Sequence, residues 1–259
     1  MNQGKKMIKN EKTMIIIPAR MEATRLPGKP LMIIDNKPMI VHIWEKAIMS
    51  VADKVIVATD SDNIIEEIIK RGGQAIKTGS DHKTGSDRVY EALLKADLEG
   101  KYSHIMNLQG DIPTIDPNII NLAIEKIKKT NADIITFGKK ITNKKDIKDP
   151  NVVKVATNLT ALGSESPALY FSRSPIPYGK GNYYEHIGLY MYKRHALEKF
   201  ILSSQTILEE RESLEQIRAL ENNLKINIIL IKDNIIGVDT IEDFRKAKKL
   251  IENQSKDKK

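Results

Sequence analysis

The chain has 259 residues, of which 41% are hydrophobic and 29% are charged, a composition typical of a globular protein rather than a disordered one. It contains no cysteine, which excludes disulfides and thiolate chemistry. The formal net charge is +8, but much of the excess lies in lysines at the two ends, and no nucleic-acid-binding motif accompanies it.

The first half of the chain predicts strands that alternate with helices. Residues 14–18 form a short apolar run without alternation, which is typical of a strand buried on both faces of a parallel sheet. The run is too short for a secretory signal, and no stretch is long enough to span a bilayer. We expect further strands at 54–58, 74–77, 104–108 and 133–137, and helices at 38–49, 61–70, 84–96 and 116–129.

The pattern changes between residues 142 and 182, where polar residues and prolines interrupt short strands at 152–156 and 168–172. This region predicts a smaller mixed β-rich insertion. Beyond it we expect a strand at 185–192, helices at 194–202 and 212–222, a strand at 226–231 and a last helix from 241. The alternation predicts an α/β fold of Rossmann-like type, with a mainly parallel sheet flanked by helices. Residues 14–250 would form one domain, and 1–13 and 251–259 flexible extensions.

Three cations, Arg20, Arg25 and Lys29, follow the first strand in a loop rich in proline. Ligands bind at the carboxyl edge of an open parallel sheet, which is where this loop should lie. Arginine holds phosphate oxygens with paired hydrogen bonds, and lysine adds a compact charge. The loop lacks the glycine spacing of a P-loop and of a dinucleotide fingerprint. We interpret it as a triphosphate-binding loop, with a solvated basic loop as the alternative.

A second motif, residues 81–88, opens a predicted helix that Thr84 and Ser86 can cap. The free amide groups at such a helix start suit an anionic or carbonyl ligand, although ordinary capping explains the residues equally well.

Two carboxylates are candidates for a magnesium site. Asp111 follows a buried strand beside Gly110, and Asp239 precedes Thr240, which caps the last helix. Mg²⁺ prefers carboxylate and phosphate oxygens and usually keeps few protein ligands. Each aspartate alone is also explained by capping of the turn or helix that follows it.

The stretch from Ile15 to Val41, with its Thr24–Pro30 and Lys37–Ile40 motifs, closely resembles the 3-deoxy-manno-octulosonate cytidylyltransferase family. These sugar nucleotidyltransferases, also called CMP-Kdo synthetases, have a glycosyltransferase-A-type fold, and the resemblance extends from about residue 14 to residue 250. It implies transfer of CMP from CTP to 3-deoxy-manno-octulosonate (Kdo), with release of pyrophosphate. It also implies a cytoplasmic homodimer in lipopolysaccharide precursor synthesis, with no membrane or nucleic-acid partner.

The resemblance also implies roles for single residues. Arg20, Arg25 and Lys29 would hold the CTP phosphates, and Thr84, Ser86 and Gln109 would line the nucleotide site. Asp111 and Asp239 would hold Mg²⁺, and together with Arg20 and Lys29 they would form the catalytic group. The implied sugar-binding residues are Gln109, Arg173, His186, Tyr190, Glu215 and Gln216, and residues 142–193 would form a sugar-binding and dimerisation subregion of the single domain.

Some of these residues have simpler explanations. His186 and Tyr190 fall on one face of a strand and could be core residues, and Glu215 and Arg218 are spaced as a surface helical pair. At Ile112 the sequence departs from the family, which usually carries glutamate there. That change removes a negative charge close to the expected metal.

Three other functions remain open at this point. A sister enzyme would activate 8-amino-Kdo, sialic acid or another acidic sugar. A nucleotide-binding paralogue would have lost catalysis, although retention of both Asp111 and Asp239 argues against it. A nucleic-acid-binding protein would need a folded basic stripe, which the sequence does not provide.

Overall fold

The structure is a computed structural model that describes residues 11–22, 25–232 and 235–256. The strands are β1 (Lys12–Ala19), β2 (Ile33–Ile34), β3 (Lys37–Pro38), β4 (Lys54–Thr59), β5 (Ala75–Lys77), β6 (Tyr102–Asn107), β7 (Ile134–Lys140), β8 (Lys154–Ala156), β9 (Glu165–Pro167), β10 (Tyr170–Ser172), β11 (Tyr184–Lys193) and β12 (Ile226–Ile231). The helices are η1 (Lys29–Leu31), α1 (Met39–Ile48), α2 (Asp62–Ile69), α3 (Gly85–Ala96), α4 (Pro117–Lys129), α5 (Lys144–Lys148), α6 (Arg194–Leu202), α7 (Ile207–Glu212), α8 (Gln216–Glu221) and α9 (Ile241–Lys256).

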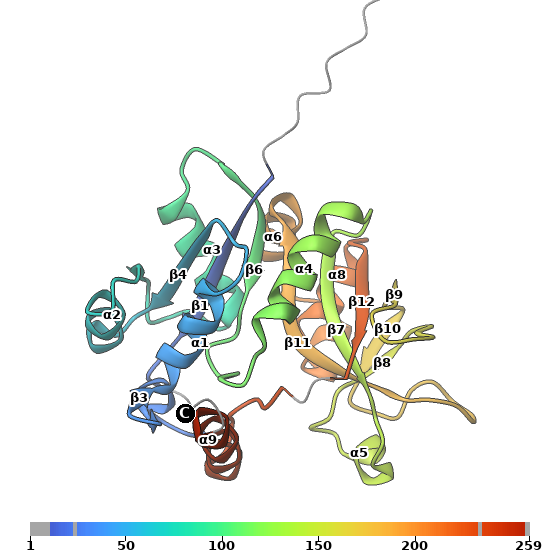
Figure 1. The fold of residues 1–259 in the computed structure, drawn as a ribbon. Coiled ribbons are helices and arrows are strands. Elements are labelled where there is room, and N and C mark those ends of the chain that lie inside the picture. The colour runs from blue at the N-terminus through green and yellow to red at the C-terminus, as the bar shows by residue number, and fades with distance from the viewer. Residues whose placement is uncertain (1–10, 23–24, 233–234, 257–259) are drawn as a thin grey trace, which may run out of the picture.

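One large sheet runs through the molecule in the order β5-β4-β1-β6-β11-β7-β12-β9 (Figure 1). β1 pairs in parallel with β4 and β6, and β12 pairs in parallel with β7. β11 runs antiparallel between β6 and β7. The predicted α/β fold with a mainly parallel sheet is therefore confirmed.

Helices cover both faces of this sheet. Ile15 and Ile17 of β1 point into a core with residues of α1, α2 and α4, whereas Met14 and Ile16 point into a second core with residues of α3, α6 and α8. All four side chains are fully buried, which explains the apolar run without alternation. In the described part of the chain, no helix is both long and apolar enough to cross a membrane.

The strand expected at 185–192 is confirmed as β11, but the region at 142–182 differs from the expected insertion. β11 lies in the middle of the main sheet, and β8, β9 and β10 join the same sheet by antiparallel pairing. The region is therefore part of the central layer. Its place in the main sheet was not visible in the sequence, because polar loops separate its short strands and because β11, to which β8 pairs, carries polar residues between apolar ones.

Three predicted boundaries also change. The helix expected at 212–222 is present as α8 but begins only at Gln216, since Ser213 adopts a left-handed conformation (φ 52°) that separates α7 from α8. β1 begins at Lys12, where it already pairs with β6. α9 continues past residue 250 to Lys256, because Phe244, Ala247 and Ile251 pack in a small core with Ile34 and Met39.

Candidate active site

A pocket of about 370 Å³ opens at the carboxyl ends of β1 and β6, the edge where the sequence predicts a ligand. Its lining includes most of the predicted site residues, namely Arg20, Arg25, Lys29, Thr84, Gln109, Asp111, Glu215 and Asp239. Pro18, Ala19, Leu26, Pro30, His82, Lys83, Gly85, Arg88 and Gly110 complete the lining. Ser86, Arg173, His186, Tyr190 and Gln216 are not part of it.

The basic loop places its cations on one side of this pocket. Gly28, the residue before η1, has φ 73°. Its amide donates to the carbonyl of Met21 at 2.8 Å. This left-handed turn favours glycine and aims the next residue, Lys29, at the carboxylates opposite. Arg20 is exposed, and within the described residues it has no carboxylate partner. Ala23 and Thr24 lie outside the described residues.

Asp111 and Asp239 converge on one cation. Nζ of Lys29 lies 2.8 Å from Oδ2 of Asp111 and 3.4 Å from Oδ1 of Asp239, and Nη2 of Arg25 lies 3.0 Å from Oδ2 of Asp239. The backbone sets this convergence, because the amide of Val238 donates to the carbonyl of Asp111 at 2.8 Å. Two distant carboxylates therefore face the same small volume.

Gly110 lets the ends of β1 and β6 approach closely. A Cβ atom at this position would lie 2.3 Å from the carbonyl oxygen of Pro18. Any other residue would push apart the strands that carry the basic loop and Asp111, so the shape of the pocket depends on this glycine.

The start of α3 confirms one capping prediction and corrects another. Thr84 forms a capping box with Asp87, in which its Oγ1 accepts from the Asp87 amide at 3.2 Å. Ser86 does not cap the helix. Its buried hydroxyl donates to Oε2 of Glu215 at 3.0 Å, and it therefore supports a pocket residue from behind.

Three lining residues received no individual role from the sequence. Lys83 adds a further cation, and the guanidinium of Arg88 is buried, 3.0 Å from Oδ2 of Asp60. The ring of His82 is hydrogen-bonded to Glu91. Burial raises the pKa of Glu91, but hydrogen bonds from Lys95 and His82 outweigh this and lower it to about 2. The signal in the sequence was the His-x-x-Gly-x-x-Arg pattern of residues 82–88, which resembles a segment that lies beside the cytidine in the family, and it predicted no single contact.

A buried polar chain connects the two sides of the pocket. Nε2 of Gln109 donates to Oδ1 of Asn107 at 3.0 Å, and Nδ2 of Asn107 donates to Oγ of Ser86 at 3.4 Å. Ser86 then donates to Glu215. Asn107 is fully buried and holds Gln109 and Ser86 in register. This role of Asn107 was not predicted, since an asparagine at a strand end is usually part of a turn.

Known proteins match nearly the whole chain. A family model described as cytidylyltransferase matches residues 14–226. A 3-deoxy-manno-octulosonate cytidylyltransferase of Brucella anthropi is 45% identical over 245 residues, which is 95% of this chain and 98% of that relative. A protein of the same name from Paramagnetospirillum magneticum is 44% identical and covers 92% of this chain and 96% of its own.

A solved structure of CMP:2-keto-3-deoxy-manno-octonic acid synthetase complexed with CTP is also similar. It has a TM-score of 0.86 and 34% identity, over 94% of this chain and all of its own. The chain belongs to the 3-deoxy-manno-octulosonate cytidylyltransferase family. The predicted family is confirmed.

In this cytidylyltransferase, His186, Tyr190 and Gln216 lie behind the pocket wall. Nε2 of His186 is 3.0 Å from the hydroxyl of Thr136, and its Nδ1 is 3.4 Å from Nε2 of Gln216. The His186 ring also contacts the ring of Phe171 edge-on and lies tilted against the ring of Tyr190. Burial lowers the pKa of His186 to about 3, so the ring is neutral at physiological pH.

Arg173 occupies a different environment from the one expected for a sugar carboxylate ligand. Its guanidinium donates to the carbonyls of Glu212, Pro150 and Ser213 at 2.7, 2.9 and 3.2 Å. Its backbone amide donates to Oε2 of Glu212 at 2.9 Å. Arg173 is therefore bonded to the loop that leads into Glu215, rather than exposed in the pocket of this cytidylyltransferase.

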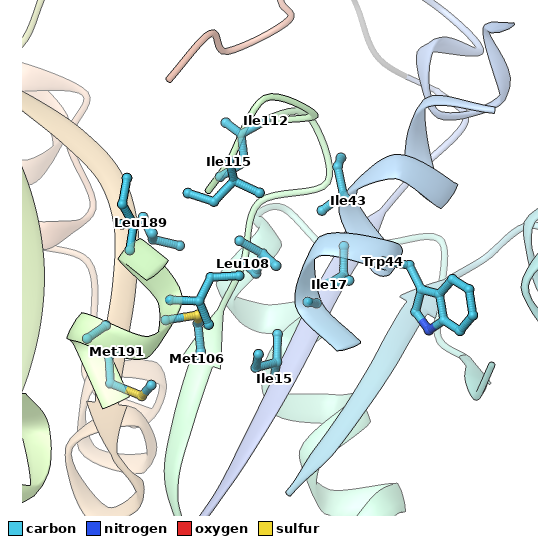
Figure 2. Packing of buried hydrophobic residues seen from close by; sticks show 14 of the residues in the cluster. Ile15, Ile17, Ile43, Trp44, Met106, Leu108, Ile112, Ile115, Leu189 and Met191 are labelled. Atoms are coloured by element: carbon cyan, nitrogen blue, oxygen red, sulfur yellow. The ribbon is translucent and has the colours of Figure 1, made fainter. Parts of the chain in front are cut away.

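Ile112 does not face the carboxylate pair. Its side chain is 7% exposed and packs in the core that contains Ile115, Leu108 and Leu189 (Figure 2). Asp111, one residue earlier, lines the pocket, whereas Ile112 does not. The isoleucine of this cytidylyltransferase therefore contributes to packing. Its side chain makes no contact with the described lining of the pocket through which the missing charge could affect a metal.

Proposed function

We propose that the pocket joins CTP to Kdo and releases pyrophosphate, with Mg²⁺ held by Asp111 and Asp239. The observation that carries the proposal is the meeting of Arg25 and Lys29 with both aspartates in one pocket at the carboxyl edge of the sheet. Relatives and a similar solved structure that bear the names of this activity support the two substrates.

The donor set suits Mg²⁺. Two carboxylates that already share an ammonium group offer oxygen ligands to one cation. Among the described residues, no group of three or more His, Cys, Asp or Glu side chains could form a metal site. A magnesium ion held by this pair would therefore complete its ligands with phosphate oxygens and water. When bound, it would supply charge neutralisation at the α-phosphate.

The cations of the pocket would bind the phosphates of the nucleotide. Arg20, which is exposed at the pocket, and Lys83 are placed to meet an anionic ligand. Arg25 and Lys29 would exchange their carboxylate partners for phosphate oxygens of the nucleotide. These groups would stabilise the departing pyrophosphate, which carries the charge released when the α–β phosphate bond breaks.

Glu215 and Gln109 would bind hydroxyls of the sugar. The Glu215 carboxyl is half-buried at the pocket, and the buried Ser86 hydroxyl fixes its direction. Burial raises the pKa of this carboxyl above its usual value, and the hydrogen bond from Ser86 offsets the rise only in part. His186, Tyr190 and Gln216 would act as the packed support of this side rather than by direct contact.

The reaction would be an in-line displacement. The oxygen of the anomeric hydroxyl attacks the α-phosphorus, the bond to the β-phosphate oxygen breaks, and the hydroxyl proton passes to solvent. The protein contributes orientation and charge neutralisation, and no covalent intermediate is formed.

A pyrophosphate-release assay tests this function. CTP, UTP, ATP and GTP are each combined with Kdo, 8-amino-Kdo or sialic acid, with and without Mg²⁺. We expect release only with CTP, Kdo and Mg²⁺ together. Equal rates with another nucleotide or with sialic acid would refute the assigned specificity.

We also propose a cytoplasmic homodimer that supplies CMP-Kdo for lipopolysaccharide synthesis. Leu162, Leu169 and Tyr178, in the region 142–193, are exposed large hydrophobic residues, and an interface between two copies would cover them. Light scattering measures the mass in solution. A monomer at micromolar concentration would refute the dimer.

A further inference from the structure

Lys29 occupies the position between the two candidate metal ligands. Its Nζ lies 2.8 Å from Oδ2 of Asp111, 3.4 Å from Oδ1 of Asp239 and 2.7 Å from the carbonyl oxygen of Val238. The Lys29 side chain is only 13% exposed, so the ammonium group is largely enclosed by these three oxygens. We call them the oxygen cage.

The oxygen cage does not depend on Lys29 for its shape. The amide of Val238 donates to the carbonyl of Asp111, and the amide of Ile236 donates to the hydroxyl of Thr114 at 2.9 Å. Val238 is fully buried in the small core beneath α9. These contacts hold the backbone of Asp111 and of the segment that leads to Asp239, and none of them involves the ammonium group.

Lys29 and a divalent cation cannot share this cage. Positive charges a few ångströms apart repel strongly in a partly buried site, and each would need the same oxygens. The lysine stem is flexible and reaches the pocket, so the ammonium group can move without a change in the backbone. It leaves three oxygen partners behind, however, and a new anionic partner must compensate for them.

We propose that Lys29 is the resident cation of the oxygen cage and yields it to Mg²⁺ only when the nucleotide triphosphate receives its ammonium group. The proposal rests on the proposed function, because it takes the triphosphate as the new partner. Lys29 thus protects the paired aspartates from mutual repulsion in the free protein. It also makes divalent-cation binding depend on CTP.

The coupling has a definite thermodynamic form. A cation that must displace Lys29 binds only to the fraction of molecules in which the cage is open, and its apparent affinity falls by that fraction. CTP raises the fraction, and by reciprocity the divalent cation strengthens the binding of CTP. Arg25, on the other oxygen of Asp239, contributes less because it is 64% exposed.

Manganese binding without nucleotide tests this exchange. Electron paramagnetic resonance measures free Mn²⁺ during titration of the wild type and of Lys29→Met, which keeps the stem and removes the charge. We expect Lys29→Met to bind Mn²⁺ about ten-fold more tightly than the wild type. The matched control is Lys37→Met. It breaks the 2.7 Å ion pair between Lys37 and Glu45, neither of which lines the pocket, and its Mn²⁺ affinity should equal that of the wild type.

Equal Mn²⁺ affinity of folded Lys29→Met and the wild type would overturn the exchange. If Lys29→Met does not unfold cooperatively, Lys29→Gln, which retains a donor for the Val238 carbonyl, takes its place in the same titration. Pyrophosphate release by the wild type is measured separately. Loss of the proposed function would therefore appear in that assay, while the titration without nucleotide still reports on Lys29.

Discussion

The hydroxyl of Ser86, at the start of α3, donates a 3.0 Å hydrogen bond to Oε2 of Glu215, the residue before α8. This contact joins a helix of the first half of the chain to the segment that follows β11. It joins the two sides of the pocket, which we propose to bind the nucleotide and the sugar. Through Asn107, the same chain of hydrogen bonds reaches Gln109.

Glu215→Gln tests the sugar side. The substitution keeps the shape and removes the charge that would accept sugar hydroxyls, so kcat/KM for Kdo should fall about 10- to 100-fold. The KM for CTP should change little. Steady-state kinetics with each substrate varied in turn measures both. Glu210→Gln, on the exposed face of α7, is the control, and a shared defect of both variants would contradict the role of Glu215.

Asp111→Asn and Asp239→Asn test the metal pair. Each replacement removes one of two charges that face a single cation, and we expect kcat to fall about 10³-fold with the fold retained. Circular dichroism checks the fold, and pyrophosphate release measures kcat. The control Asp62→Asn removes an exposed carboxylate paired with Lys77 and should retain full activity. Substantial turnover by either site variant would rule out the shared cation.

Gly110→Ala tests the close approach of β1 and β6. The added methyl group would overlap the Pro18 carbonyl, so the free energy of unfolding should fall by about 1–3 kcal/mol and activity should drop. Urea denaturation measures the first effect. Gly188→Ala is the control, since nothing lies within 4 Å of a Cβ atom there, and it should be close to neutral.

Arg173→Met separates two roles. If Arg173 holds the loop at Glu212 and Ser213, its loss should lower the free energy of unfolding by about 1–2 kcal/mol, because both carbonyls lose a charged donor at a partly exposed position. A ligand of the Kdo carboxylate would instead raise the KM for Kdo without a change in stability. Thermal unfolding and kinetics on the same sample distinguish these results.

Because His186 is buried in its neutral form, we expect the free energy of unfolding to fall in acid. Its pKa is about 3 in the folded chain and 6.5 in the unfolded reference, because burial disfavours the charged ring. Between these values the unfolded chain binds the extra proton, so stability rises with pH by up to about 1.4 kcal/mol per unit from this group. The contribution is complete above the unfolded pKa. Denaturation of the wild type and His186→Phe from pH 4 to 7 measures it, and equal slopes would contradict the assignment.

Much of the fold could be predicted from the sequence, because strand burial and helix capping leave local patterns in this chain. Buried parallel strands such as β1 have no apolar alternation, and Thr84 and Asp116 cap helices where the sequence placed them. The segments of β8, β9 and β10 were assigned to an insertion because the hydrophobic pattern reports burial but not which strands are neighbours. The break at Ser213 depends on a backbone conformation that a serine rarely adopts.

The pocket was predictable in part for similar reasons. Arg20, Arg25, Lys29, Asp111 and Asp239 lie in loops at one sheet edge, and parallel topology brings such loops together. The environments of Arg173, His186 and Asn107 depend on contacts between segments that are distant in sequence. No local pattern distinguishes a pocket side chain from one that lies directly behind the pocket wall.

The most direct measurement is the anomalous scattering of Mn²⁺ in crystals grown with CTP. We expect one peak between the carboxylates of Asp111 and Asp239, in contact with a phosphate oxygen, with Lys29 moved onto the triphosphate. A peak elsewhere, or CTP bound away from Arg20 and Arg25, would contradict the assignment of this pocket.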